Sequence, residues 1–129
     1  MSPANAEVVI IDDDLDMIET LREFLDIAGH SLIATVSSRD ELVDLLKKKK
    51  SIFSNTGKGV FLVDGNLTPN DTSGRDGDWC VSSIKRVFPK PFPIVIGRAL
   101  EKPVSGADLQ MTKHEVSNFS EVARRITGL

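Results

Sequence analysis

Charged side chains follow three apolar stretches of this chain. The runs at 8–11 and 60–63 and the weaker one at 109–111 lead into Asp12, Asp13 and Asp14, then Asp64, and then Lys113. Carboxylates that meet in one place form an oxygen-rich pocket suited to Mg²⁺, a hard cation that keeps several waters. A lysine beside such a pocket supplies a point positive charge for an anion. Together these groups are suited to handling a phosphoryl group, and an aspartate can also accept that group covalently.

The three adjacent aspartates are costly to place together, because like charges a few ångströms apart repel one another. A bound cation would offset that cost. The alternative is that Asp14 caps the following helix while Asp12 and Asp13 are solvated loop acids. The triplet alone leaves both interpretations open, so the residues that join it must decide between them.

The elements that would position these residues follow from the spacing of the apolar residues. Short apolar runs predict strands buried on both faces, and apolar residues recurring every three or four positions predict amphipathic helices. The predicted strands are 8–11, 31–36, 60–63, 94–96 and 109–111, and the predicted helices lie at 15–28, around 42–46, at about 77–88 and at about 115–126. This alternation predicts an α/β fold, a doubly wound five-stranded parallel sheet. In such a sheet Asp12, Asp13, Asp64 and Lys113 can meet at the carboxyl ends of the strands.

Composition narrows the classes of function. A chain of 129 residues, 40% hydrophobic and 27% charged, is expected to form a single domain over 1–129 with its core at about 7–127. Its net charge of -3 gives no reason to propose nucleic acid or a membrane as a partner. The lone Cys80 and the absence of a recognisable signal peptide or spanning helix lead us to expect a cytoplasmic protein. Cys80 and Trp79 are expected to be packing residues, and His30 a surface turn residue.

Three fragments, in the right order, resemble the receiver domain of response regulators in two-component signalling. Residues 8–14 resemble the family's first strand with its acidic pair, and 61–67 its third strand with the phospho-accepting aspartate. Residues 106–108, followed by Lys113, resemble the segment that leads to the family's invariant lysine. The resemblance covers essentially the whole chain and implies a flavodoxin-like fold of the receiver type.

The resemblance also implies a role for each residue. Asp64 would take a phosphoryl group from a histidine kinase or histidine phosphotransfer protein, with Mg²⁺ as the cofactor. Asp13 would ligate the ion directly and Asp12 through water. Asp64 and the backbone carbonyl of Asn66 would be the remaining protein ligands. Lys113 would contact a phosphoryl oxygen. A receiver is not a conventional enzyme: at most it catalyses its own phosphorylation and dephosphorylation, and it acts on a downstream protein that the sequence does not identify.

The chain departs from the family's pattern on the face that normally carries the response. Arg98 stands where receivers have Thr or Ser, and it could either bind phosphate through its guanidinium or point to solvent. Gln110 replaces the aromatic switch residue, and His114 replaces the proline that usually follows the lysine.

Two changes of length accompany these substitutions. Between Arg98 and Lys113 the chain is about two helical turns shorter than is typical of the family, so the fourth helix of the fold is expected to be shortened to a stub or a loop. The loop after Asp64 is longer by about five residues and contains Asp71 and Asp76. These two acids could hold a second cation, but solvated turn acids are the expected role.

Three functions fit these observations. The first is a receiver that accepts phosphate at Asp64 and changes its binding to a partner. The second is a pseudo-receiver, an interaction module that works without a phosphorylation switch; the replaced Thr/Ser and aromatic positions favour it, and the retained acids and lysine oppose it. A remote third is a haloacid-dehalogenase-like phosphatase, which would need an acidic metal motif after the fourth strand, where Gly97 and Arg98 stand.

Overall fold

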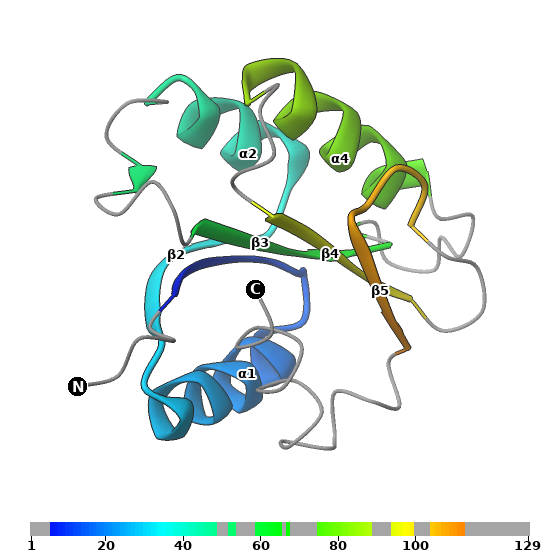
Figure 1. The fold of residues 1–129 in the computed structure, drawn as a ribbon. Helices are drawn as coiled ribbons and strands as arrows, with labels where there is room; N and C mark the ends of the chain where they lie inside the picture. The colour runs from blue at the N-terminus through cyan, green and yellow to red at the C-terminus, as the bar shows by residue number, and fades with distance from the viewer. Residues whose placement is uncertain are drawn as a thin grey trace.

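A parallel five-stranded sheet forms the centre of the molecule (Figure 1). The computed structural model describes residues 6–48, 52–53, 59–65, 67, 75–88, 94–99 and 104–112. The strands are β1 (Glu7–Ile11), β2 (Ser31–Val36), β3 (Gly59–Asp64), β4 (Ile94–Ala99) and β5 (Leu109–Thr112). They lie in the order β2-β1-β3-β4-β5, and every neighbouring pair is parallel. The predicted α/β class and parallel sheet are confirmed.

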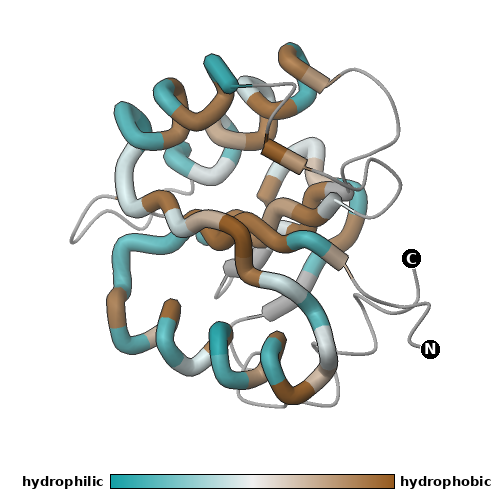
Figure 2. The backbone as a smooth tube through the Cα atoms, turned by 90° about the vertical axis from the view of Figure 1, so that its left-hand side faces the viewer, coloured by the Kyte–Doolittle hydropathy of each residue, from teal (hydrophilic) through white to brown (hydrophobic). Residues whose placement is uncertain are grey.

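Helices cover both faces of this sheet. Helix α1 (Leu15–Ala28) lies on one face, and α2 (Arg39–Leu46) and α4 (Arg75–Val87) lie on the other (Figure 1). Strand β1 serves both layers, because successive side chains of a strand point to opposite faces. Its Val8 and Ile10 pack in the core cluster under α1, and its Val9 and Ile11 in the cluster under α2 and α4. In Figure 2 the strands form a largely apolar band between helices in which hydrophilic and hydrophobic residues alternate.

Both ends of α1 lie where the sequence predicts them. The carboxylate of Asp14 is the N-cap and accepts hydrogen bonds from two backbone N–H groups of the first turn, at 3.0 and 3.2 Å. At the other end Gly29 has a φ of 85°, a left-handed conformation that glycine adopts without strain. The N–H of His30 then donates to the carbonyl of Leu25 at 2.9 Å and closes the helix.

The second layer differs from the prediction in small ways. The Ser38 hydroxyl caps α2 by accepting from the N–H of Glu41 at 3.2 Å, and Val43, one of the apolar residues on which the predicted helix at 42–46 rests, is 40% exposed. Helix α4 begins at Arg75, ahead of the predicted start, and buries Cys80 completely, which confirms that Cys80 is a core residue. None of the described helices is long and apolar enough to cross a membrane.

The connection between β4 and β5 differs most from the expectation. Strand β4 continues to Ala99, so 97–99, expected to begin the connection, pair with their neighbours in the sheet instead. The described part of the connection, 104–108, is a turn in which Gly106 has a φ of 83°. The rest of the expected stub, 100–103, lies outside the described residues, as does the predicted helix at 115–126.

Candidate functional site

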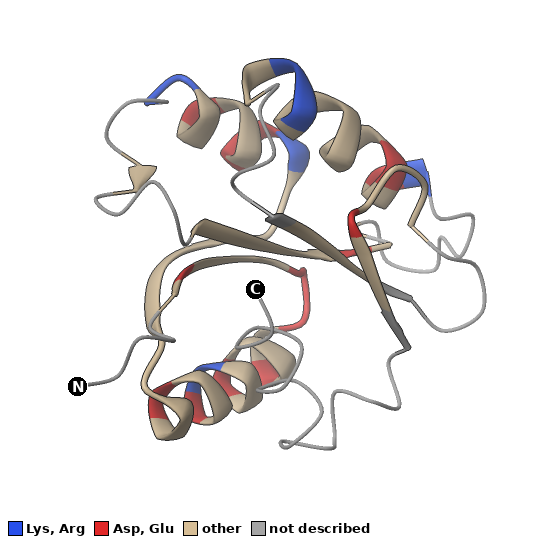
Figure 3. Ribbon diagram, in the orientation of Figure 1, with Lys and Arg blue, Asp and Glu red and all other residues tan. Residues whose placement is uncertain are grey.

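Three carboxylates meet where β1 and β3 end. These strands are neighbours in the sheet and Ile11 pairs with Val63, so that Asp12 and Asp64, the residues that follow, lie side by side. Asp13 joins them: one carboxylate oxygen from each of the three residues lies within 4.8 Å of the others. Figure 3 shows the acidic segment as the red turn that leads from β1 to α1. The predicted gathering of acids at the carboxyl edge of the sheet is therefore present for these three residues.

Hydrogen bonds hold the turn after β1 in place. The N–H of Asp12 donates to the carbonyl of Val36 on β2 at 2.9 Å, and its carboxylate Oδ1 accepts from the N–H of Asp14 at 2.9 Å. The carboxylate of Asp14 caps α1 and does not belong to the cluster. The acidic triplet is thus divided between two tasks, a carboxylate pair beside Asp64 and a helix cap.

The burial of the cluster indicates what it can bind. Asp12 and Asp64 are only 1% and 2% exposed, whereas Asp13 is open to solvent. Buried carboxylates are stable in proteins when hydrogen bonds or a metal compensate their charge, and a cation among them removes their mutual repulsion. Oxygen donors with one side open to water are the surroundings that Mg²⁺ accepts, since it keeps several of its own waters. The residues present therefore fit a magnesium ion.

The loop that follows Asp64 is fastened to the first turn of α4. The N–H of Gly77 donates to the carbonyl of Gly65 at 2.9 Å, and the N–H of Leu67 donates to Oδ2 of Asp76 at 2.9 Å. The contact between the two glycines is close, because a Cβ on Gly77 would lie 2.7 Å from the Cα of Gly65. Only a residue without a side chain lets the helix approach the loop in this way.

Asp76 is not the solvated turn acid that the sequence suggested, because it is only 4% exposed. The second cation site that it could form with Asp71 stays a prediction, since Asp71 lies outside the described residues. The carboxylate of Asp76 accepts from the Leu67 N–H and from Nε of Arg39 on α2, the latter at 2.8 Å. Because α4 starts early, Asp76 lies in its first turn and is turned inward. Sequence reasoning also missed Arg39, since no local pattern connects it to a carboxylate 37 positions later.

Some of the predicted site residues are described only in part or not at all. Arg98 pairs with Asp64 in the register of β3 and β4, which places its backbone beside the phospho-acceptor candidate. Its side chain lies outside the described part of the structure, as do Lys113, Asn66, His114 and Asp71. Their proposed roles accordingly stay predictions.

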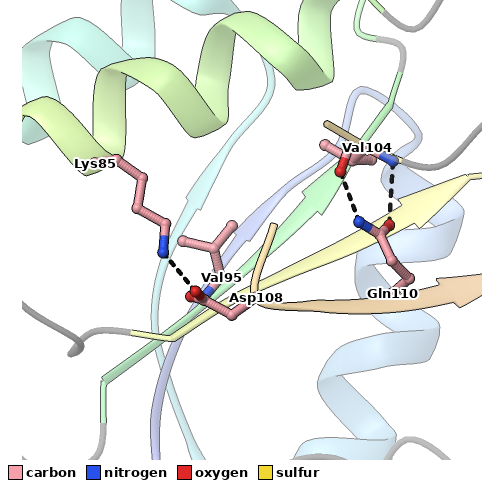
Figure 4. Close-up of polar contacts among 5 residues, drawn as sticks. All are labelled: Lys85, Val95, Val104, Asp108 and Gln110. Carbon is pink, nitrogen blue, oxygen red and sulfur yellow. Dashed lines mark hydrogen bonds and ion pairs between the residues drawn. The ribbon is translucent and has the colours of Figure 1, made fainter. Parts of the chain in front are cut away.

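Gln110, which the sequence resemblance sets at the aromatic switch position of receivers, binds the backbone of the turn 104–108. Its Oε1 accepts from the N–H of Val104 at 3.1 Å, and its Nε2 donates to the Val104 carbonyl at 2.7 Å (Figure 4). Val104 is buried against Gly97, where an added Cβ would lie 2.6 Å from the Val104 Cβ. The Gln110 side chain is therefore fixed to the turn through both the oxygen and the nitrogen of its amide.

The same turn is also fastened at its other end. The carboxylate of Asp108 accepts from Nζ of Lys85 at 2.6 Å and from the N–H of Val95 at 2.8 Å (Figure 4). In addition, the N–H of Ser105 donates to Oδ1 of Asp78 at 2.8 Å. The turn 104–108 is thus joined to α4, β4 and β5.

Three further residues singled out in the sequence have structural roles outside the acidic cluster. Burial, with the nearby charge of Asp76 as a second cause, raises the pKa of the Cys80 thiol to about 12, which removes it as a nucleophile. Trp79 is half-buried, with the guanidinium carbon of Arg39 5.0 Å from its ring centre, so its expected packing role is confirmed. His30 was expected at the surface and is instead 5% exposed, because its Nδ1 accepts from the N–H of Ala6 at 3.0 Å and ties the start of the chain to the end of α1.

Comparisons with known proteins give the fold a name. No protein-family model matches the sequence, and no curated protein matches it either. Solved structures match it over nearly its whole length. A response regulator receiver domain from Clostridium thermocellum has a TM-score of 0.66 at 18% identity, with 95% of this chain and 93% of that chain covered.

Two other similar structures are described by what they bind. The receiver domain of a sensor histidine kinase from Pseudomonas aeruginosa has magnesium coordinated in its active-site cleft; its TM-score is 0.66 at 12% identity, over 97% of this chain and 99% of that one. CheY6 from R. sphaeroides, in complex with the phosphorylated P1 domain of CheA3, has a TM-score of 0.62 at 15% identity, over 96% and 98%. This chain has the fold of the response regulator receiver domains.

Proposed function

We propose that this protein is a Mg²⁺-dependent receiver domain that accepts a phosphoryl group on Asp64 and thereby alters its binding to a downstream protein. The observation that carries the proposal is the meeting of Asp12, Asp13 and Asp64 within 4.8 Å at the carboxyl ends of neighbouring strands. Open α/β sheets bind their ligands at this edge. Asp12 and Asp64 are buried, whereas Asp13 is exposed, so the site is accessible to solvent on the side of Asp13.

Each residue has one task in the proposed transfer. Asp13 would ligate Mg²⁺ directly and Asp12 through water, and Asp64 and the backbone carbonyl of Asn66 would be the remaining protein ligands. When bound, the ion neutralises charge on the phosphoryl oxygens. A carboxylate oxygen of Asp64 forms a bond to phosphorus while the bond between phosphorus and the donor's histidine nitrogen breaks. Lys113 contacts a phosphoryl oxygen, and the backbone position of Arg98 beside Asp64 would allow its guanidinium to do the same.

The comparisons support this choice of cofactor and partner. The Pseudomonas receiver domain of a sensor histidine kinase has magnesium in its active-site cleft, and CheY6 was crystallised with the phosphorylated P1 domain of CheA3. By analogy we propose a histidine kinase or a histidine phosphotransfer protein as the phosphoryl donor.

The experiment is phosphorylation by a small donor. The protein is incubated with acetyl phosphate, or with beryllofluoride as a phosphoryl mimic, with and without Mg²⁺, and modification is followed by intact mass and by NMR. We expect a Mg²⁺-dependent modification that is lost in Asp64→Ala. Asp14→Asn is the matched control: it removes a neighbouring charge outside the cluster, keeps a good helix cap and leaves the modification unchanged.

One observation favours the second candidate, an interaction module without a phosphorylation switch. Gln110 is bound to Val104 through both the oxygen and the nitrogen of its side-chain amide, whereas a switch residue has to change its position. A wild-type protein that stays unmodified and does not bind beryllofluoride, while still binding a partner equally well as Asp64→Ala, would support this module and exclude the first proposal.

A further inference from the structure

The first turn of α4 lies against the end of β3, and backbone atoms alone make the contact. The N–H of Gly77 donates to the carbonyl of Gly65 at 2.9 Å. A Cβ on Gly77 would lie 2.7 Å from the Gly65 Cα and 3.1 Å from the carbonyl oxygen of Asp64. The first distance is far inside the ordinary separation of two carbon atoms. The helix therefore comes this close to Asp64 only because residue 77 has no side chain.

Helix α4 is held firmly enough that it would not simply move away from an added side chain. In its first turn the buried carboxylate of Asp76 accepts from Nε of Arg39 at 2.8 Å, and Asp78 accepts from the N–H of Ser105 at 2.8 Å. Its inner face packs in the core through three buried residues, Cys80, Val81 and Ile84. A displacement of the helix would loosen all of these contacts at once.

Strand β3 is held on both sides, but only as far as Asp64. Its register with β1 runs to Val63 and its register with β4 runs to Asp64. Gly65 is the first residue beyond these pairs. An added side chain at position 77 would thus be accommodated where the structure is held least, at the peptide that joins Asp64 to Gly65.

We propose that Gly77 is a positioning residue of the phosphorylation site. Its backbone supports the peptide between Asp64 and Gly65 and so sets where the Asp64 carboxylate lies relative to Asp12 and Asp13. This inference rests on the proposed function, because it takes Asp64 to be the phospho-acceptor. Gly77 contacts neither the metal nor the phosphoryl group, and acts through the backbone of Asp64.

The proposed reaction is sensitive to small displacements of this carboxylate. One oxygen from each of the three acids lies within 4.8 Å of the others, so a shift of one backbone by a fraction of that distance changes the whole group. A misplacement of about 1 Å costs a reaction on the order of a hundredfold in rate. A shift of a few tenths of an ångström at Asp64 should therefore be measurable as a slower transfer.

The test compares Gly77→Ala with Gly29→Ala. Both variants add one methyl group to a glycine that the structure requires: Gly77 for its close contact, and Gly29 for its φ of 85°. Gly29 ends α1, at the opposite end of that helix from Asp14, about 20 Å away at the rise of an α-helix. Urea unfolding first establishes that both variants are folded under the assay conditions and how much stability each has lost.

The rate of phosphorylation by acetyl phosphate is then measured at saturating Mg²⁺, with intact mass as the readout. We expect Gly77→Ala to react at least about tenfold more slowly than the wild type, and Gly29→Ala to stay within about twofold of it. Mg²⁺ affinity, measured by titration calorimetry, should also fall in Gly77→Ala alone. A merely structural role for Gly77 would lower stability and leave the rate of the folded protein unchanged.

A second measurement uses the wild type and needs no variant. Coupling between two sites is reciprocal, so a ligand at Asp64 must in turn stabilise the contact that positions Asp64. Amide hydrogen exchange at Gly77, followed by NMR, should slow by at least about tenfold when Mg²⁺ and beryllofluoride are added. Exchange at Gly29, whose N–H donates to the carbonyl of Asp26 at 3.1 Å, should change by less than about twofold.

The outcomes separate the two proposals. Phosphorylation of Gly77→Ala at the wild-type rate, or an equal slowing in Gly29→Ala, would overturn the positioning role and leave the proposed receiver function intact. If Gly77→Ala does not fold, the exchange measurement decides, and an equal change at Gly77 and Gly29 overturns the inference. A wild type that Mg²⁺ and acetyl phosphate leave unmodified at Asp64 would overturn the receiver function and this inference together.

Discussion

At the scale of single residues, the three consecutive aspartates behave as two different kinds of group. Asp12 is buried and faces Asp64 across neighbouring strands, and Asp13 is exposed beside them. The carboxylate of Asp14 instead caps α1. Three identical side chains at consecutive positions thus differ in burial and in the groups that they contact. The difference comes from the end of β1, where the chain leaves the sheet and turns into α1.

Removing one of the buried charges should change how the protein responds to Mg²⁺. In Asp12→Asn the amide oxygen can still accept from the Asp14 N–H, but the repulsion within the cluster falls. We expect the free energy of unfolding without metal to rise by roughly 1 kcal/mol, and Mg²⁺ to lose most of its stabilising effect. Urea unfolding with and without Mg²⁺ measures both quantities.

The control for this prediction is again Asp14→Asn, which should keep the wild-type response to Mg²⁺ because its side chain is outside the cluster. A metal-free Asp12→Asn protein less stable than the wild type would contradict the prediction, as it would show that the carboxylate makes contacts worth more than the repulsion it causes.

At the scale of elements, the connection from β4 to β5 is the most heavily fastened described turn near the candidate site. Val104 is bound by Gln110, Ser105 by Asp78, and Asp108 by Lys85 and Val95. The close packing of Val104 on Gly97 adds a steric contact to these polar ones. These contacts can order the described turn 104–108 although it is not helical.

The contact between β4 and this turn can be tested with one methyl group. In Gly97→Ala the new Cβ would lie 2.6 Å from the Val104 Cβ and 2.9 Å from Oε1 of Gln110, far inside contact distance. We expect a loss of about 1–3 kcal/mol in the free energy of unfolding, measured by urea denaturation.

The control removes the side chain of Val104, which the new methyl group would meet. Combining Gly97→Ala with Val104→Gly, which removes the Cβ that the new methyl group would meet, should cost less than the sum of the two single losses. Strictly additive losses in the double variant would show that the glycine is required for another reason.

At the scale of the whole molecule, the layered fold and the acidic cluster could be predicted from sequence, because both depend on local patterns. Apolar runs and helical spacing placed all five strands and the bounds of α1, and the acids follow directly from the ends of β1 and β3. The buried positions of Asp76 and His30 could not be predicted in this way. Each depends on a partner far along the chain, Arg39 at 37 positions and Ala6 at 24, and no local periodicity encodes such a pair.

Burial of a thiol in the core shared by the sheet and α4 gives the whole fold a pH dependence. The pKa of Cys80 is raised to about 12 in the folded protein, above its ordinary value of 9.0. Between these values the unfolded chain loses the thiol proton and the folded chain keeps it, so this contribution to stability is complete below about pH 9 and is lost as the pH rises toward 12. We expect a loss of about 1 kcal/mol for each pH unit above 9.

Urea unfolding at pH 8 and pH 10 of the wild type and Cys80→Ala isolates this contribution. The alanine variant is less stable at pH 8 because of the space it leaves, but the gap between the two proteins should narrow at pH 10. A constant gap would mean that the thiol ionises as easily in the folded protein as in the unfolded chain.

The fastened turn between β4 and β5 has a consequence for how information could leave the molecule. Even a surface that keeps its shape can change its electrical potential, and the proposed phosphorylation of Asp64 would bring close to two negative charges to the acidic cluster. A partner protein bound near this turn would then be attracted or repelled by long-range electrostatics, and not selected by a change in the shape of the surface. Such a readout would weaken as salt is added, and its range would be that of the Debye length.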